Sequence, residues 1–213
     1  SMVSEEEKQK FAYKIQLPLD DIYNSWYEGP KNINYNYQDV LSDEPNFKVM
    51  LERENIEIPD SAGMVHYFRS KSLNSNSLEF DIEQGFISEK MQKFLSDNKN
   101  DIKTEIFQDF VTERKQYIDE YLESRIKEGD VKNVVILGSA GDSRGHRIKA
   151  LNKVKIWEVD NKNNIKLKKH LVNKFSKIKK NNIKYVSIDI NKEIPKEIKM
   201  KNTIVVAEGL SFH

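Results

Sequence analysis

One stretch near the middle of the chain decides the fold: Val134-Val135-Ile136-Leu137-Gly138-Ser139-Ala140-Gly141-Asp142-Ser143-Arg144. Its first four residues form a continuous apolar run, which is typical of a strand buried on both faces of a parallel sheet. The glycine-rich turn that follows lets backbone N–H groups approach a ligand closely, because glycine has no Cβ to block them. The stretch therefore predicts an α/β fold with a ligand site where this strand ends.

Downstream of this stretch, short β-branched runs alternate with lysine-rich segments. Further strands are expected at residues 154–159, 185–188 and 203–207, and an amphipathic helix is expected from Ile165 to Ile178. Strands separated by helix-length spacers indicate parallel βαβ units with right-handed crossovers.

Upstream of the stretch, the pattern is helical and irregular. Apolar residues with a period near 3.6 predict a long helix over residues 101–127 that ends at Gly129. Another helix is expected to begin near Ser88, and the proline-containing residues 29–60 are expected to form a loop or lid. We therefore divide the chain into residues 1–100, a helical or irregular cap, and residues 101–213, the α/β core.

Composition excludes several classes of protein. The 213 residues carry 35 basic and 34 acidic side chains, a net charge of +1, which gives no overall attraction to nucleic acid or acidic lipid. The chain has no cysteine, which excludes a disulfide scaffold and a thiolate metal site and fits a reducing cytoplasm. No apolar run approaches the roughly 20 residues of a membrane-spanning helix, and the acidic N-terminus predicts no signal peptide. We expect no nucleic-acid or membrane partner and no metal.

Acidic residues follow the predicted strands. Glu158 and Asp160 end the second, Asp189 follows the third, and Glu208 follows the fourth. Each alone is explained as well by a helix N-cap, but the ordered set favours a ligand site at the carboxyl rim of the sheet. An acid in the place of Asp160 suits the two hydroxyls of a ribose.

The sequence of the turn indicates which class of nucleotide cofactor it suits. A dinucleotide fingerprint needs G-x-G-x-x-G, and Ala140 replaces its second glycine; a phosphate-binding G-K-[ST] is absent. A mononucleoside cofactor is therefore favoured over NAD.

Arg114 lies within an apolar stripe of the long helix, formed by Phe107, Val111, Ile118 and Leu122. A guanidinium on such a face needs a partner, because an unpaired buried charge is costly. Two interpretations remain open from spacing alone. The partner is either a carboxylate of the chain, Asp119 or Glu113, or the carboxylate of an amino-acid-like ligand held by two hydrogen bonds.

The motifs together resemble the leucine carboxyl methyltransferase family. They occur in order: Arg114 with Asp119, the strand and turn ending Asp142-Ser143-Arg144 with Arg147, then Trp157-Glu158-Val159-Asp160, and Glu208-Gly209-Leu210. The family pattern reads R-x-x-x-x-D, L-G-A-G-x-D-[TS]-R-x-x-R, [FW]-E-V-D and E-G. The resemblance covers residues 110–213, and it looks closer to the bacterial and polyketide-type branch than to the branch that modifies a protein phosphatase.

The resemblance implies a Rossmann-like class I methyltransferase fold with S-adenosyl-L-methionine as cofactor. It implies that Arg114 holds the methionine carboxylate, Gly138 lies beside the methionine moiety and Asp160, with Glu158 as its neighbour, binds the ribose. Asp189 and Ile190 would border the adenine, and Glu208 would lie near the methionine ammonium. The sequence departs from the pattern at Ala140 and at His146, which takes a place that is often aromatic. Arg69-Ser70-Lys71 is explained as well by surface charge as by a further carboxylate contact.

The expected activity is transfer of a methyl group to an oxygen of a small-molecule hydroxyl or carboxylate. The alternatives are methylation of a C-terminal leucine carboxylate of a protein, a non-catalytic cofactor-binding interaction module and, more remotely, a nicotinamide-dependent oxidoreductase. No catalytic base is identified, since His66 and His146 are candidates by residue type only. Strands one to four would form only the 3-2-1-4 half of a seven-stranded sheet. We therefore expect either a fragment, or an oligomer or complementary chain that supplies the rest, or a degenerate cofactor-binding module.

Overall fold

The computed structural model describes residues 60–100, 102–176, 180–190, 192–193 and 195–208. The predicted lid at residues 29–60 lies almost wholly outside these residues. The centre of the fold is a four-stranded parallel sheet in the order β3-β2-β1-β4. Its strands are β1 (Asn133–Leu137), β2 (Lys155–Asp160), β3 (Ile183–Ser187) and β4 (Thr203–Ala207). The predicted α/β class, the four strands and their order are confirmed.

Both faces of the sheet are covered by apolar contacts. On one face, Val134 and Ile136 of β1 pack with Leu122 and Ile126 and with Leu151. On the other face, buried Val135, Trp157 and Val159 pack with residues of the segment between β3 and β4. The continuous apolar run of β1 therefore marks a strand that is buried on both sides, as its sequence predicts.

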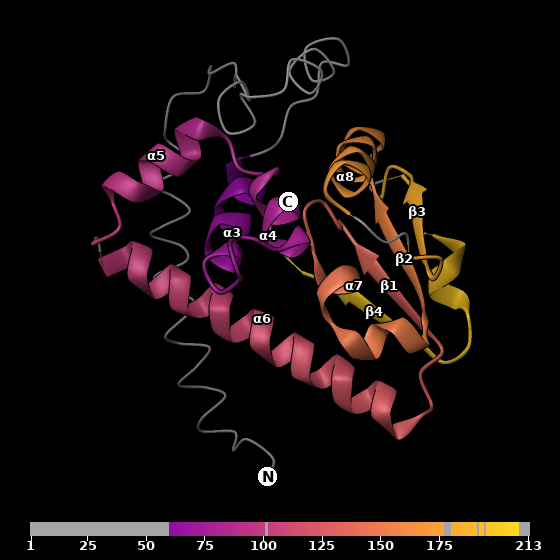
Figure 1. Ribbon diagram of the computed structural model, residues 1–213. Helices are drawn as coiled ribbons and strands as arrows, with labels where there is room; N and C mark the ends of the chain where they lie inside the picture. Colours follow the sequence, from indigo (N-terminus) through magenta and orange to yellow (C-terminus); the bar gives the residue numbers. More distant parts are fainter. Residues whose placement is uncertain (1–59, 101, 177–179, 191, 194, 209–213) are drawn as a thin grey trace.

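The long helix α6 (Ile102–Glu128) joins two parts of the molecule (Figure 1). Its first half buries Phe107 and Val111 among the preceding helices, and its second half packs on the sheet through Leu122 and Ile126. The helix ends before Gly129, whose φ of +88° favours glycine. The predicted helix and its breaker are confirmed.

Within the described residues, three short helices precede α6: α3 (Asp60–Ser70), α4 (Leu78–Gln84) and α5 (Glu89–Asp97). Ser77 and Ser88 cap α4 and α5 by accepting hydrogen bonds from the backbone N–H groups of Phe80 and Met91. Helix α3 contacts α4, α5 and α6, while α4 contacts the helices beside the sheet. Figure 1 shows α3 and α4 between α6 and the end of the sheet where β1 finishes.

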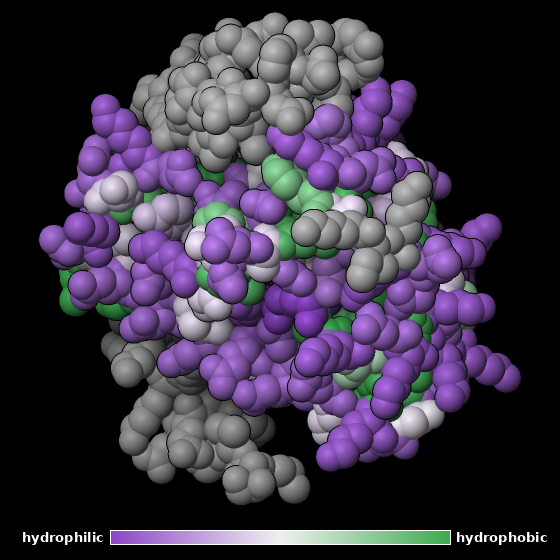
Figure 2. Space-filling model, viewed as in Figure 1, coloured by the Kyte–Doolittle hydropathy of each residue, from purple (hydrophilic) through white to green (hydrophobic). Residues whose placement is uncertain are grey.

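The connections of the sheet are short. The glycine-rich turn after β1 leads into α7 (Arg144–Arg147) and the 3-10 turn η1 (Lys149–Lys153), and β2 is followed by α8 (Lys162–Phe175). A second 3-10 turn, η2 (Lys196–Lys199), precedes β4. The surface in Figure 2 is mainly hydrophilic, with small apolar patches. None of the helices within the described residues has the length and apolar character needed to cross a bilayer.

Candidate functional site

The glycine-rich turn folds back over the end of β2. Gly138 has a φ of +60° and Ala140 a φ of +28°, the left-handed region that favours glycine. Two backbone groups fix this shape: the N–H of Ser139 donates to the carbonyl of Val159 (3.1 Å), and the N–H of Ala140 donates to Oδ2 of Asp160 (2.7 Å). Ala140 therefore adopts a backbone conformation that is usual for glycine. The turn forms even though Ala140 departs from the family pattern.

Asp160 lies at the end of β2, against the turn. Besides the N–H of Ala140, its carboxylate accepts from the backbone N–H of Asn161 (2.7 Å) and the side-chain amide of Asn164 (2.9 Å). A carboxylate offers about four lone-pair sites, so one remains for a further donor. Asp160 thus holds the turn and retains capacity for one ligand hydroxyl.

Glu158 lies beneath the turn, away from any surface. It is fully buried and pairs with Lys168, which is also fully buried and donates to the carbonyl of Asp142 (2.6 Å). Burial raises the pKa of Glu158 to about 7, and Lys168 offsets only part of that effect. This pair supports the underside of the turn, so Glu158 is a neighbour of Asp160 in the chain and has no opening to a ligand.

Arg114 and Glu208, which are 94 residues apart, come together at the carboxyl ends of the central strands. Nε and Nη2 of Arg114 each lie 3.0 Å from Oε1 of Glu208. The guanidinium also lies over the ring of Phe110, 4.8 Å from its centroid. The chain partners expected for Arg114 are wrong: Asp119 instead pairs with Arg144 and Arg147, because it lies over the start of α7.

Glu208 is held by three arginines. Besides Arg114, Nη1 of Arg144 lies 2.7 Å and Nη1 of Arg69 lies 3.7 Å from its Oε2. Burial would raise the pKa of Glu208, but the three guanidinium groups outweigh it and hold the pKa at about 2. Glu208 is therefore a carboxylate at neutral pH.

Arg69 is a central member of the site, so its interpretation as surface charge is wrong. It is only 3% exposed, and its Nη2 lies 3.0 Å from Oδ1 of Asp142 and 3.3 Å from Oε1 of Glu83. Sequence spacing missed Glu83 and left the role of Arg69 open, because their partners lie far along the chain. The one signal was a pair of polar residues, His66 and Arg69, three positions apart on α3.

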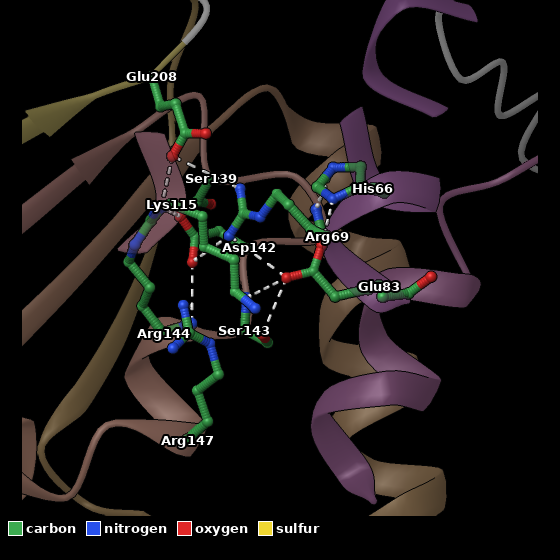
Figure 3. A network of polar contacts seen from close by, with 12 residues as sticks. His66, Arg69, Glu83, Lys115, Ser139, Asp142, Ser143, Arg144, Arg147 and Glu208 are labelled. Atoms are coloured by element: carbon green, nitrogen blue, oxygen red, sulfur yellow. Dashed lines mark hydrogen bonds and ion pairs between the residues drawn. The ribbon is translucent and has the colours of Figure 1, made fainter. Parts of the chain in front are cut away.

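These contacts form one buried polar network, shown in Figure 3. Asp142 joins its parts, since Oδ2 accepts from Nη1 of Arg144 at 2.5 Å while Oδ1 contacts Arg69. Arginines and carboxylates are equal in number within it: Arg69, Arg114, Arg144 and Arg147 against Glu83, Asp119, Asp142 and Glu208. The charges of these ion-paired side chains therefore balance, and each has an opposite partner.

Asp189 and Ile190 lie at the far side of the site. Asp189 follows β3, is about half-exposed and pairs with Lys192 at 3.0 Å. Ile190 packs against the apolar cluster that contains Trp157. The N–H of Ile188 donates to the carbonyl of Asp160 (3.0 Å), which ties this segment to the end of β2. The structure thus brings Asp189 and Ile190 near Asp160 in the fold but gives them no contact with Arg114 or Glu208.

Neither histidine considered as a base is free to take a proton from an acceptor. Both ring nitrogens of His66 have protein partners, Glu83 and the N–H of Gly141. Burial, with Lys168 and Lys180 nearby, lowers the pKa of His146 to about 3, and its Nε2 lies 3.2 Å from the hydroxyl of Tyr185. Within the described part of the chain, no cluster of His, Asp or Glu side chains is suited to a metal ion.

An open parallel sheet with a glycine-rich turn after β1, an acid at the end of β2 and an acid after β4 defines a Rossmann-like protein of the methyltransferase class. The sequence profile of the leucine carboxyl methyltransferase family matches residues 65–213, so the chain belongs to that family. Its members are S-adenosylmethionine-dependent methyltransferases, and this chain is an enzyme of that type. The match begins within α3 and so includes the cap helices, whereas the motifs alone covered residues 110–213. A search of curated proteins finds no significant match.

Proposed function

We propose that this enzyme transfers the methyl group of S-adenosylmethionine to an oxygen of a small molecule, a hydroxyl or a carboxylate. We assign cofactor binding to Arg114, Gly138, Asp160, Asp189, Ile190 and Glu208. The observation that carries the proposal is the contact between Arg114 and Glu208 beside the glycine-rich turn.

The paired charges of the network suit the amino-acid end of the cofactor. That end carries both a carboxylate and an ammonium group. A zwitterion that takes the place of the Arg114–Glu208 contact gives the guanidinium a new carboxylate and the carboxylate a new ammonium. A ligand with only the positive charge would leave Arg114 without its carboxylate, which is costly.

The polar atoms around this contact also have capacity left for a ligand. Within the described residues, Nε of Arg69, Nη2 of Arg144 and Oγ of Ser139 are buried and make no hydrogen bond. Buried donors and acceptors normally have partners. The surplus donors fit the carboxylate of a methionine moiety, while its ammonium would share Glu208 with the arginines that already contact it.

The chain's own residues supply positioning. Bound S-adenosylmethionine supplies a methyl group on a sulfonium, which is already a good leaving group. Arg114 and Glu208 fix the amino-acid end, Asp160 accepts a ribose hydroxyl and the backbone of Gly138 permits close approach. The adenine side is bordered by Asp189 and Ile190. A carboxylate acceptor needs no base, which agrees with the engagement of both His66 and His146.

Methyl-transfer assays test the acceptor. The enzyme is incubated with S-adenosylmethionine labelled on the methyl group and either a panel of small carboxylic acids and phenols or a peptide that ends in leucine. We expect label in the small-molecule products and none in the peptide. Label in the peptide alone contradicts the proposed substrate class, and an amidated peptide is the control for methylation elsewhere on it.

A further inference from the structure

His66 and Glu83 form a buried pair between the cap helices α3 and α4. Nδ1 of His66 lies 2.5 Å from Oε2 of Glu83, and both side chains are almost completely buried. Since Nε2 of His66 accepts a hydrogen bond from a backbone N–H, the proton of the neutral ring is on Nδ1 and is donated to Glu83. The pair therefore has a defined tautomer and orientation.

The free ends of this pair both reach the glycine-rich turn. The N–H of Gly141 donates to Nε2 of His66 at 3.2 Å. Oε1 of Glu83 accepts from the hydroxyl of Ser143 at 2.8 Å and from its backbone N–H at 3.3 Å. Two backbone donors of the turn, which lie just before α7, are thus satisfied by side chains from helices 60 or more residues earlier in the sequence.

The turn and the cap also touch sterically. A Cβ on Gly141 would lie 2.9 Å from Cδ2 of Phe86 and 3.1 Å from Cε1 of His66, so only glycine fits without a shift. This contact explains why position 141 of the turn is a glycine. The closest approach of another element occurs at position 141, while Ala140 is placed by its hydrogen bond to Asp160.

We propose that His66 and Glu83 are positioning residues for the cofactor. They fix the glycine-rich turn from the side of the cap, while Asp160 fixes it from the opposite side. This inference rests on the proposed function, because it assumes that the turn binds S-adenosylmethionine. Neither side chain touches the cofactor. They act through the N–H groups of Gly141 and Ser143 and so set the backbone path that begins at Gly138.

His66→Phe tests the proposal, because it keeps a ring of similar size and removes both hydrogen bonds. The matched control is Phe68→Leu, which reduces packing on the opposite side of α3, where Phe68 contacts Phe107 and not the turn. Three quantities are measured for each protein: melting temperature, affinity for S-adenosylmethionine by calorimetric titration, and hydrogen exchange of peptides covering residues 138–144.

We expect His66→Phe to weaken S-adenosylmethionine binding by about tenfold and to speed exchange in the turn. Phe68→Leu should lower the melting temperature while leaving both of those quantities near the wild-type values. His66→Gln, which offers an acceptor at the ε position, should recover part of the affinity. It also serves as the test variant if His66→Phe does not fold.

Equal affinity and equal exchange in His66→Phe and Phe68→Leu would overturn the proposal. If the wild type itself does not bind S-adenosylmethionine, the proposed function fails. Hydrogen exchange in the turn then tests separately whether His66 restrains the turn. Faster exchange in His66→Phe than in the wild type supports this restraint, and unchanged exchange contradicts it.

Discussion

Glu158 shows how one residue's environment fixes its protonation. The carboxyl ends a strand beside Asp160, yet it faces the interior, where it pairs with Lys168. A Cβ on Gly145 would lie 2.9 Å from Oε1 of Glu158, so glycine at this position makes room for the carboxyl group. Two acids two residues apart thus differ in role, because one lies at the rim of the sheet and the other under the turn.

The raised pKa of Glu158 predicts a pH-dependent stability. The pKa rises from 4.5 to about 7 because of burial, so the folded state binds this proton more tightly than the unfolded state. The stabilisation is fully present below pH 4.5 and is lost as the pH rises through about 7. Lys168 keeps its contact with the carbonyl of Asp142 in either protonation state.

Glu158→Gln is the variant for this prediction, since the amide cannot titrate. Melting temperatures of wild type and variant are compared at intervals from about pH 5 to about pH 8. We expect the wild-type value minus the variant value to fall as the pH rises. A difference that stays constant or grows would show that Lys168 keeps Glu158 charged at its ordinary pKa.

Arg114 shows what the sequence predicts about a single residue and what it does not. Its place in an apolar stripe predicts a buried guanidinium that needs a partner, and the structure confirms this need. The partner was not predictable from spacing, because Glu208 comes from the far end of the chain. Glu83 was missed for the same reason, and the roles of Arg69 and His66 were left open, since each meets residues that only the tertiary fold brings close.

At the scale of elements, periodicity was a reliable guide. The four strands lie within two residues of their predicted limits, and α6 has its predicted extent, because long apolar patterns and an unambiguous breaker determine both. The helix expected from Ile165 to Ile178 is observed as Lys162–Phe175. Its predicted end is wrong, because Ser176 already has an extended conformation, with a φ of −83° and a ψ of 123°. The cap helices have weaker patterns, and their role in holding the turn depends on contacts and not on periodicity.

The contact between α4 and α8 allows a direct test of packing. Gly85 ends α4 in a helical conformation, with a φ of −64°, and a Cβ there would lie 2.5 Å from Cδ1 of the buried Leu171. Gly85→Ala should therefore destabilise the fold by about 1–3 kcal/mol through overpacking. Chemical denaturation measures the change.

Gly63→Ala, in α3, is the matched control. A Cβ at Gly63 meets no atom closer than 3.4 Å, so the gain in helix propensity should leave stability unchanged or raised by up to about 1 kcal/mol. Equal losses for both variants would contradict the close contact of α4 with α8.

At the scale of the whole molecule, the buried network joins the cap to the sheet. Arg69 and Glu83 come from α3 and α4, Arg114 from α6, Asp142 and Arg144 from the turn and α7, and Glu208 from the end of β4. Any ligand at the Arg114–Glu208 contact therefore stabilises several elements at once. The expected association with another chain stays a prediction; within the described residues, the outer edge of β4 pairs with no strand.

The central claim is that the Arg114–Glu208 contact binds the amino-acid end of S-adenosylmethionine. Arg114→Met removes the guanidinium but leaves Glu208 paired with Arg144 at 2.7 Å, so the ligand-free protein should melt near the wild-type temperature. Arg125→Met is the control, because Arg125 lies on the same helix and pairs only with exposed carboxylates. Arg114→Lys should not restore full affinity, because an ammonium cannot reproduce the two-pronged contact.

The measurement that decides this claim is a calorimetric titration of S-adenosylmethionine into wild type, Arg114→Met and Arg125→Met. We predict that Arg114→Met loses at least about tenfold in affinity, about 1.4 kcal/mol, while Arg125→Met binds like the wild type. Equal affinity of wild type and Arg114→Met would contradict the claim and leave Arg114 with a purely structural role.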